Sequence, residues 1–69
     1  MQRYFIKENN IDLDNNRIII DGNDVHHIKN VMRMNLGDEV ICTFNNKSYL
    51  SKIINISDVV CLEIIKQMD

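Results

Sequence analysis

The chain has 69 residues, 45% of them hydrophobic, with a formal net charge of −2, no proline and two glycines. This length allows one small domain, residues 1–69, and the apolar content is too high for a disordered chain. No apolar run approaches the roughly 18 residues that span a membrane, and no signal-peptide pattern opens the chain, so we expect a cytoplasmic protein without membrane contact.

The charge balance limits the nucleic-acid functions that the chain can have. Stand-alone binders of nucleic acid usually carry a clear basic excess, because neutralised phosphates supply most of their affinity. Here any such function must depend on where the cations lie. Cys42 and Cys61 have no C-x-x-C partner, which predicts two free, packed thiols and no metal site.

Two strands are predicted in the first third of the chain. Arg3–Ile6 is a short aromatic and β-branched run, and Arg17–Ile20 is apolar enough to be buried on both faces or to lie at a barrel seam. Between them, 12–16 is polar and turn-like, with asparagines that tolerate left-handed backbone angles.

The segment Asp24–Met34 has the one clear helical periodicity of the chain. With about 100° between successive residues, one side of the helix is apolar and is expected to face the core. The apolar side comprises Val25, Ile28, Val31 and Met32, and the opposite side comprises His26, Lys29, Asn30 and Arg33. Asn23 or Asp24 is the expected N-cap, and Gly37 is the expected site of positive φ after the helix.

The remainder of the chain is predicted to be strands and turns. Residues 39–44, 49–56 and 59–65 alternate or are rich in β-branched residues, and Asn45-Asn46 fits a two-residue hairpin turn. About five strands, with one short amphipathic helix after the second, indicate a mostly β protein. The expected architecture is a small, mostly antiparallel barrel or rolled sheet.

The polar side of the predicted helix is the best functional candidate. Arg33 can form paired hydrogen bonds to a phosphate, Lys29 can act as a point charge, and His26 can stack on a base. A solvated face that only keeps the helix soluble explains the same pattern. His27 lies at the boundary and is expected to be structural, bonding a backbone carbonyl.

Catalysis finds little support in these residues. The chain contains no nucleophile elbow, phosphate-binding loop, zinc-protease or dinucleotide motif. His26 and His27 are adjacent on the helix, so their rings point about 100° apart and cannot converge on one atom. In the first strand, Arg3 and Tyr4 are further binding candidates, although a surface arginine and a half-buried tyrosine are the simpler interpretation.

Three segments together resemble a known family. Met1-Gln2-Arg3-Tyr4-Phe5, then His26-His27-Ile28 with Val31-Met32-Arg33, then Gly37-Asp38-Glu39-Val40 are similar in order and spacing to the N-terminal domain of ribosomal RNA small subunit methyltransferase E. The resemblance extends over essentially the whole chain. It implies a small PUA-like β-barrel that binds RNA.

The resemblance also implies the function of a longer protein. In that family a C-terminal SPOUT domain binds S-adenosylmethionine, dimerises and methylates N3 of a uridine in 16S rRNA. We therefore expect this chain to be a fragment that lacks the cofactor and the catalytic residues and is inactive alone. Its expected partners are 16S rRNA or the small ribosomal subunit, and its own SPOUT domain. The full-length protein is expected to be a homodimer. The alternative is a small barrel that docks on another protein or domain. The RNA-binding candidates are Arg3, Tyr4, His26, Lys29, Asn30 and Arg33, where Lys29 and Asn30 depend on helix geometry alone.

Overall fold

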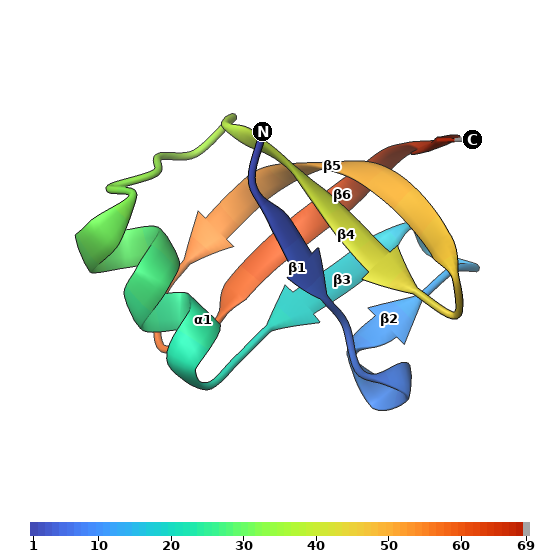
Figure 1. The fold of residues 1–69 in the computed structure, drawn as a ribbon, viewed down its shortest axis with the longest axis horizontal. Coiled ribbons are helices and arrows are strands. Elements are labelled where there is room, and N and C mark those ends of the chain that lie inside the picture. The colour runs from blue at the N-terminus through green and yellow to red at the C-terminus, as the bar shows by residue number, and fades with distance from the viewer. Residues whose placement is uncertain (69) are drawn as a thin grey trace.

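In the computed structural model, which describes residues 1–68, six strands form one curled sheet in the order β1-β4-β5-β6-β3-β2 (Figure 1). The elements are β1 (Arg3–Phe5), a 3₁₀ turn (Glu8–Asn10), β2 (Ile11–Asp12), β3 (Arg17–Ile20), α1 (Asn23–His26), a π-helical continuation of α1 (His27–Val31), β4 (Glu39–Phe44), β5 (Lys47–Ile56) and β6 (Val60–Met68).

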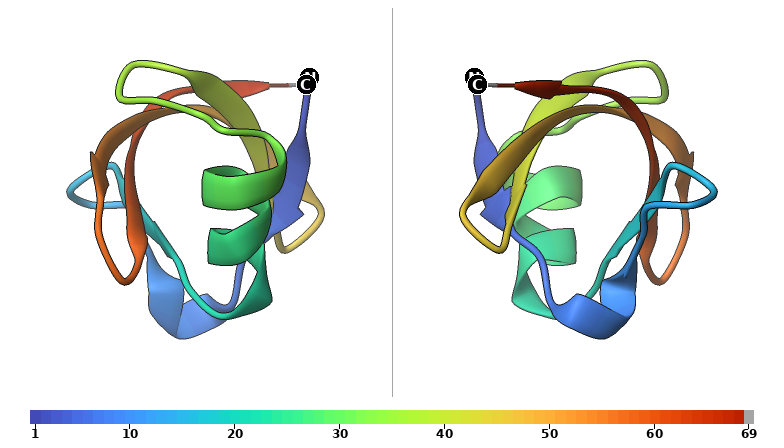
Figure 2. Two further views of the ribbon diagram at one scale, coloured as in Figure 1. Left: turned by 90° about the vertical axis from the view of Figure 1, so that its left-hand side faces the viewer. Right: turned by 90° about the vertical axis from the view of Figure 1, so that its right-hand side faces the viewer.

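The sheet curls into an open barrel, and the helix lies across one end of it (Figure 2). Four of the strand pairs are antiparallel, whereas β1 lies parallel to β4. This confirms the predicted mostly β barrel with one short helix. No helix within residues 1–68 is long and apolar enough to cross a membrane.

The core lies between the curled sheet and the helix. Alternate residues of β4 and β6 point inward, as predicted, and bury Val40, Cys42, Val60, Leu62 and Ile64. The expectation that β3 is buried on both faces was wrong. Its burial alternates, because one face of β3 remains open to solvent, and Ile19 is 40% exposed.

The turns use left-handed asparagines where they were predicted. Asn45 and Asn46 have φ values of 53° and 63° and join β4 directly to β5. Asn16, with φ 56°, closes the turn before β3. Asp12 was predicted to lie in the turn but belongs to the two-residue strand β2, because so short a strand has no periodicity to detect.

The helix differs from its prediction at both ends. It begins at Asn23 after Gly22, and neither Asn23 nor Asp24 forms a side-chain cap. It ends at Val31, where a Met32 N–H donates to the His27 carbonyl at 2.8 Å. The donor and the acceptor of this hydrogen bond are five residues apart, which is the π-helical pattern. The wider turn changes the direction of the side chains that follow.

The π-helical turn explains two wrong burial predictions. Val31 and Met32 were expected to face the core, but Val31 is 60% exposed and Met32 is 39% exposed. Met34 packs against the core in their place. The positive φ expected at Gly37 does occur, at 91°, but in a later turn, while Arg33 carries the positive φ directly after the helix.

Candidate nucleic-acid interface

The polar side of the helix is exposed, as its periodicity predicted. His26 Nδ1 and Asn30 Nδ2 are 3.0 Å apart, one helical turn from each other, and both side chains remain accessible. The Lys29 ammonium donates to the Ser57 carbonyl in the β5–β6 turn at 3.2 Å. Lys29 therefore fastens the helix to the sheet through a neutral group and keeps its positive charge.

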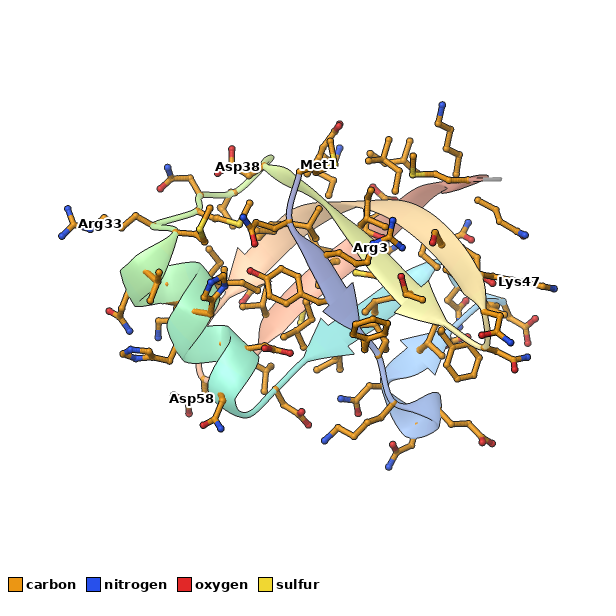
Figure 3. The ribbon with its side chains drawn as sticks, in the orientation of Figure 1. Met1, Arg3, Arg33, Asp38, Lys47 and Asp58 are labelled. Carbon is orange, nitrogen blue, oxygen red and sulfur yellow. The ribbon has the colours of Figure 1, made fainter. Side chains whose placement is uncertain are left out.

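Arg33 follows the helix in a left-handed conformation, with φ 51°. The next N–H, from Met34, donates to the Ile28 carbonyl at 3.0 Å and closes the helix end. Glycine is the residue best suited to this position, and a long side chain there is strained. The arginine projects away from the body of the molecule at the end of the helix (Figure 3). Backbone strain of this kind is often found at functional positions.

Tyr4 and His27 join the first strand to the inner side of the helix. The Tyr4 hydroxyl lies 2.8 Å from His27 Nδ1, and the two rings meet edge to face at 5.8 Å. Burial, together with the nearby Asp24 and Cys42 side chains, raises the pKa of Tyr4, so its hydroxyl stays protonated. The tautomer of His27 decides which of the two atoms donates the hydrogen bond. His27 is structural, but its Nδ1 partner is this hydroxyl and not the predicted backbone carbonyl.

Tyr4 cannot serve as an RNA contact in this arrangement, because only 4% of it is exposed. Its neighbours on β1 alternate with it, and Phe5 is 77% exposed. Phe5 was not among the predicted site residues. Strand alternation was the available signal, but two adjacent aromatics do not indicate which of them faces the core.

Arg3 lies on the outer face of the sheet. Its guanidinium donates from one nitrogen to Thr43 Oγ1 at 3.0 Å and to Ser48 Oγ at 2.9 Å. Both hydroxyls are neutral, so they orient the arginine without cancelling its charge. Its other nitrogens are left to bind an incoming group.

Ion pairing divides the cations of the chain into two sets. Lys7, Arg17 and Lys52 each lie within 4.0 Å of a carboxylate. Among residues 1–68, no carboxylate forms an ion pair with the remaining five, which are Arg3, Lys29, Arg33, Lys47 and Lys66. An acidic chain thus presents uncompensated positive charge at the helix and on the outer sheet, where phosphates would be attracted.

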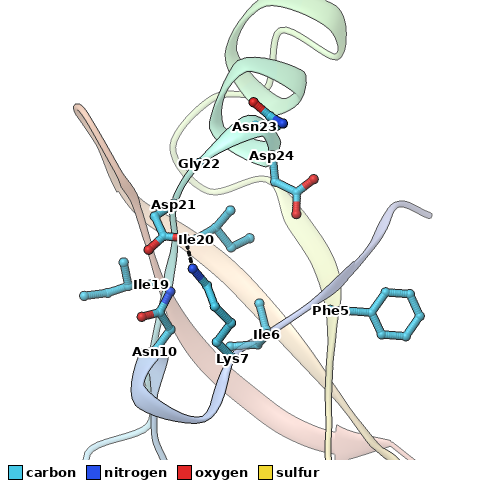
Figure 4. A pocket seen from close by; sticks show the side chains of 10 residues that line it. All are labelled: Phe5, Ile6, Lys7, Asn10, Ile19, Ile20, Asp21, Gly22, Asn23 and Asp24. Atoms are coloured by element: carbon cyan, nitrogen blue, oxygen red, sulfur yellow. Dashed lines mark ion pairs between the residues drawn. The ribbon is translucent and has the colours of Figure 1, made fainter.

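A cleft of about 230 Å³ separates the end of β1 from β3 and the start of the helix (Figure 4). The Lys7 ammonium lies 3.0 Å from Asp21 Oδ1 across it and, with Asn10, lowers the pKa of Asp21. The cleft is smaller than the roughly 300–1,000 Å³ of typical small-molecule sites.

Comparison with known proteins agrees with this geometry. Residues 20–59 match the family model described as RNA methyltransferase PUA domain. A stretch of 43 residues, 61% of the chain, is 51% identical to ribosomal RNA small subunit methyltransferase E of Bacillus subtilis (strain 168), and the chain covers 17% of that protein.

Two solved structures have the same fold over 99% of the chain. One is a crystal structure of a hypothetical protein, with a TM-score of 0.83 and 33% identity. The other is ribosomal RNA small subunit methyltransferase E from Neisseria gonorrhoeae bound to S-adenosyl methionine, with a TM-score of 0.74 and 16% identity. The chain covers 30% and 28% of these two proteins, respectively.

The family model covers more than half of the chain, including the helix, β4 and all of β5. The three segments that suggested the resemblance lie on β1, on the helix and on the turn that leads into β4. The chain therefore belongs to the RNA methyltransferase PUA domain family.

Proposed function

We propose that residues 1–69 form an RNA-binding domain that positions 16S rRNA for methylation at uridine N3. The S-adenosylmethionine and the catalytic residues belong, in this proposal, to a separate SPOUT domain of a homodimeric, cytoplasmic enzyme. The family membership supports the methyltransferase context. The cofactor assignment follows from the relative from Neisseria gonorrhoeae that binds S-adenosyl methionine.

The observation that carries the proposal is the unpaired positive charge on the helix. Arg33 projects from the end of the helix in a left-handed conformation, and Lys29 keeps its charge while bonding a neutral carbonyl. His26 and Asn30 add hydrogen-bonding groups one turn apart. Together with Arg3 on the sheet, these residues are suited to contact phosphates and sugars of structured RNA, which orient a substrate without reading its sequence.

Salt dependence of binding tests this proposal. A fluorescent hairpin from 16S rRNA is titrated with the chain at increasing KCl concentration, and log Kd is plotted against log salt. We expect binding to weaken as the salt concentration rises. Arg33→Ala is expected to reduce the magnitude of the log–log slope by about 0.9, the value for the loss of one phosphate contact on a duplex. Arg17→Ala is the matched control, because Arg17 is already paired with Glu63 at 3.4 Å.

Two results contradict the proposal. One is binding that is absent or independent of salt, and the other is an equal effect of Arg33→Ala and Arg17→Ala. Methyl transfer to 30S subunits by these 69 residues with S-adenosylmethionine would also contradict it, since the chemistry is assigned to another domain.

A docking module is the second candidate, and one observation favours it. Val31, Met32 and Leu36 are exposed apolar side chains on both sides of Arg33, at 60%, 39% and 65% exposure. Such a group of residues is typical of a surface that packs on another protein domain. In that case Val31→Ser reduces association with the partner domain, whereas the salt dependence of RNA binding is absent from the isolated chain.

A further inference from the structure

The register of the sheet places two acid-free rows of side chains on its outer face. Across β1, β4, β5 and β6, one row consists of Arg3, Ile41, Leu50 and Lys66, and the next of Phe5, Thr43, Ser48 and Met68. None of these eight side chains is a carboxylate. The neighbouring row is different, because it alternates in charge and is internally paired through Glu63, which contacts Arg17 at 3.4 Å and Lys52 at 4.0 Å.

An exposed aromatic ring stands beside an oriented cation in these rows. Phe5 is 77% exposed and stands at the rim of the cleft described above, where it is one of the lining residues (Figure 4). Arg3 is two residues earlier on the same strand face, about 6.6 Å along β1. The ring is therefore open to a ligand that stacks on it.

We infer that this outer sheet face binds single-stranded RNA, with an unpaired base stacked on Phe5 and an adjacent phosphate held by Arg3. Unstacked bases on aromatic side chains, with cations along the backbone, are the usual means of recognising single-stranded nucleic acid. The hydroxyls of Thr43 and Ser48 hold the Arg3 guanidinium in place before the RNA arrives. Phe5 and the rest of this face lie outside the helix surface, which faces structured RNA in the function proposed above, and Arg3 is common to both. This inference depends on that function.

The cations without carboxylate partners suggest a path for the RNA strand over the surface. Figure 3 shows Arg33, Arg3 and Lys47 in this order along the long axis of the molecule, in projection. Lys47 opens β5 at the hairpin tip, and none of the three has a carboxylate partner among residues 1–68. A strand leaving a structured element at the helix can therefore follow this line across Phe5 to the hairpin. A duplex would not expose a base face to stack on the ring.

Short labelled oligoadenylate and oligouridylate test the inference, with a duplex of the same length as competitor. We expect the 69-residue chain to bind the single strands in preference to the duplex. Phe5→Ala is expected to raise Kd about tenfold with an unchanged salt dependence, because stacking is lost and no charge is removed. Phe5→Trp is expected to restore binding, and Arg3→Ala to reduce the log–log salt slope by about 0.7, the value for one phosphate on a single strand.

Leu13→Ala is the matched control, since Leu13 is an exposed apolar residue in the turn before β3, at 48% exposure. The inference is overturned if Phe5→Ala binds the single strands as tightly as wild type, or no more weakly than Leu13→Ala. If Phe5→Ala has no effect on single-strand binding but the rRNA hairpin still binds through Arg33, only the inference about the sheet face is wrong and the proposed function remains. When neither RNA binds the folded chain, both are wrong.

Discussion

The hydroxyl of Tyr4 and Nδ1 of His27 lie 2.8 Å apart and connect the edge strand β1 to the inner side of the helix. The residue after His27 in the helix, Ile28, is fully buried, whereas the residue before it, His26, is exposed. This contact therefore fixes the rotation of the helix. As a result, the polar side of the helix and Arg3 are held in one fixed relation to each other.

Replacement of Tyr4 by phenylalanine is expected to destabilise the chain by about 1 kcal/mol, the usual net value of a part-buried hydrogen bond. Urea unfolding measures the change. In a double-mutant cycle, Tyr4→Phe and His27→Ala should show coupling, because they remove the same bond. His26→Ala is the control and should show none, and equal coupling with both histidines would refute the assignment.

Arg33→Gly is expected to stabilise the fold by about 1 kcal/mol, since glycine adopts the left-handed conformation without the strain of a side chain. Arg33→Ala keeps the strain and should leave the free energy of unfolding nearly unchanged. Both variants should weaken RNA-hairpin binding equally, because both remove the guanidinium. If Arg33→Gly were no more stable than Arg33→Ala, the strain at φ 51° would not be real.

Gly22→Ala is expected to destabilise the chain by about 2 kcal/mol. Gly22 has φ 70° and ψ −145°, a backbone region that residues other than glycine rarely occupy. A Cβ there would meet no atom within 4 Å, so the cost comes from the backbone alone. Thermal unfolding measures it. Asn23→Ala is the control and should change the stability by less than about 0.5 kcal/mol, because Asn23 makes no side-chain cap.

Cys42 is expected to make the stability fall with rising pH. Burial raises the pKa of Cys42 from 9.0 to about 11, so the folded chain holds this proton after the unfolded chain has lost it. The contribution of the Cys42 thiol to the free energy of unfolding is fully present below about pH 9 and is lost as the pH rises to about 11. Its size is of order 2 kcal/mol. Urea unfolding at several pH values should show a shallower decline for Cys42→Ala than for wild type. Cys61→Ala should keep the wild-type decline, and a decline that is identical in all three proteins would contradict the assignment.

The parts of the fold that follow from local pattern were predictable. The alternation in β4 and β6 and the paired asparagines between β4 and β5 indicated strands and a tight turn, because these signals lie within a few residues. The parallel pairing of β1 with β4 was not predictable, since it depends on residues far apart in the sequence. The two-residue strand β2 has no period of its own.

The candidate surface was predictable only in part. The exposed positions of His26, Lys29 and Asn30 followed from helical periodicity, whereas Arg33 is exposed beyond the end of the helix, in a left-handed conformation. The π-helical turn changes that periodicity from His27 onward, and so the exposure of Val31 was missed. In β1, only tertiary packing decides that Tyr4 faces inward while Phe5 faces outward.

The sheet order has a consequence for how the chain folds as it is synthesised. Arg3 of β1 pairs with Ile41, and Ile20 of β3 pairs with Val60, so β1 and the β2–β3 pair can join the sheet only after the second half of the chain emerges. The consecutive strands β4, β5 and β6 pair with their neighbours in sequence and can form as soon as they are made. We therefore expect folding to begin in this meander, because local pairing costs less loop entropy. On this order of events β1 adds to β4 after the meander has formed, and the surface that carries Arg3 and Phe5 exists only from then on.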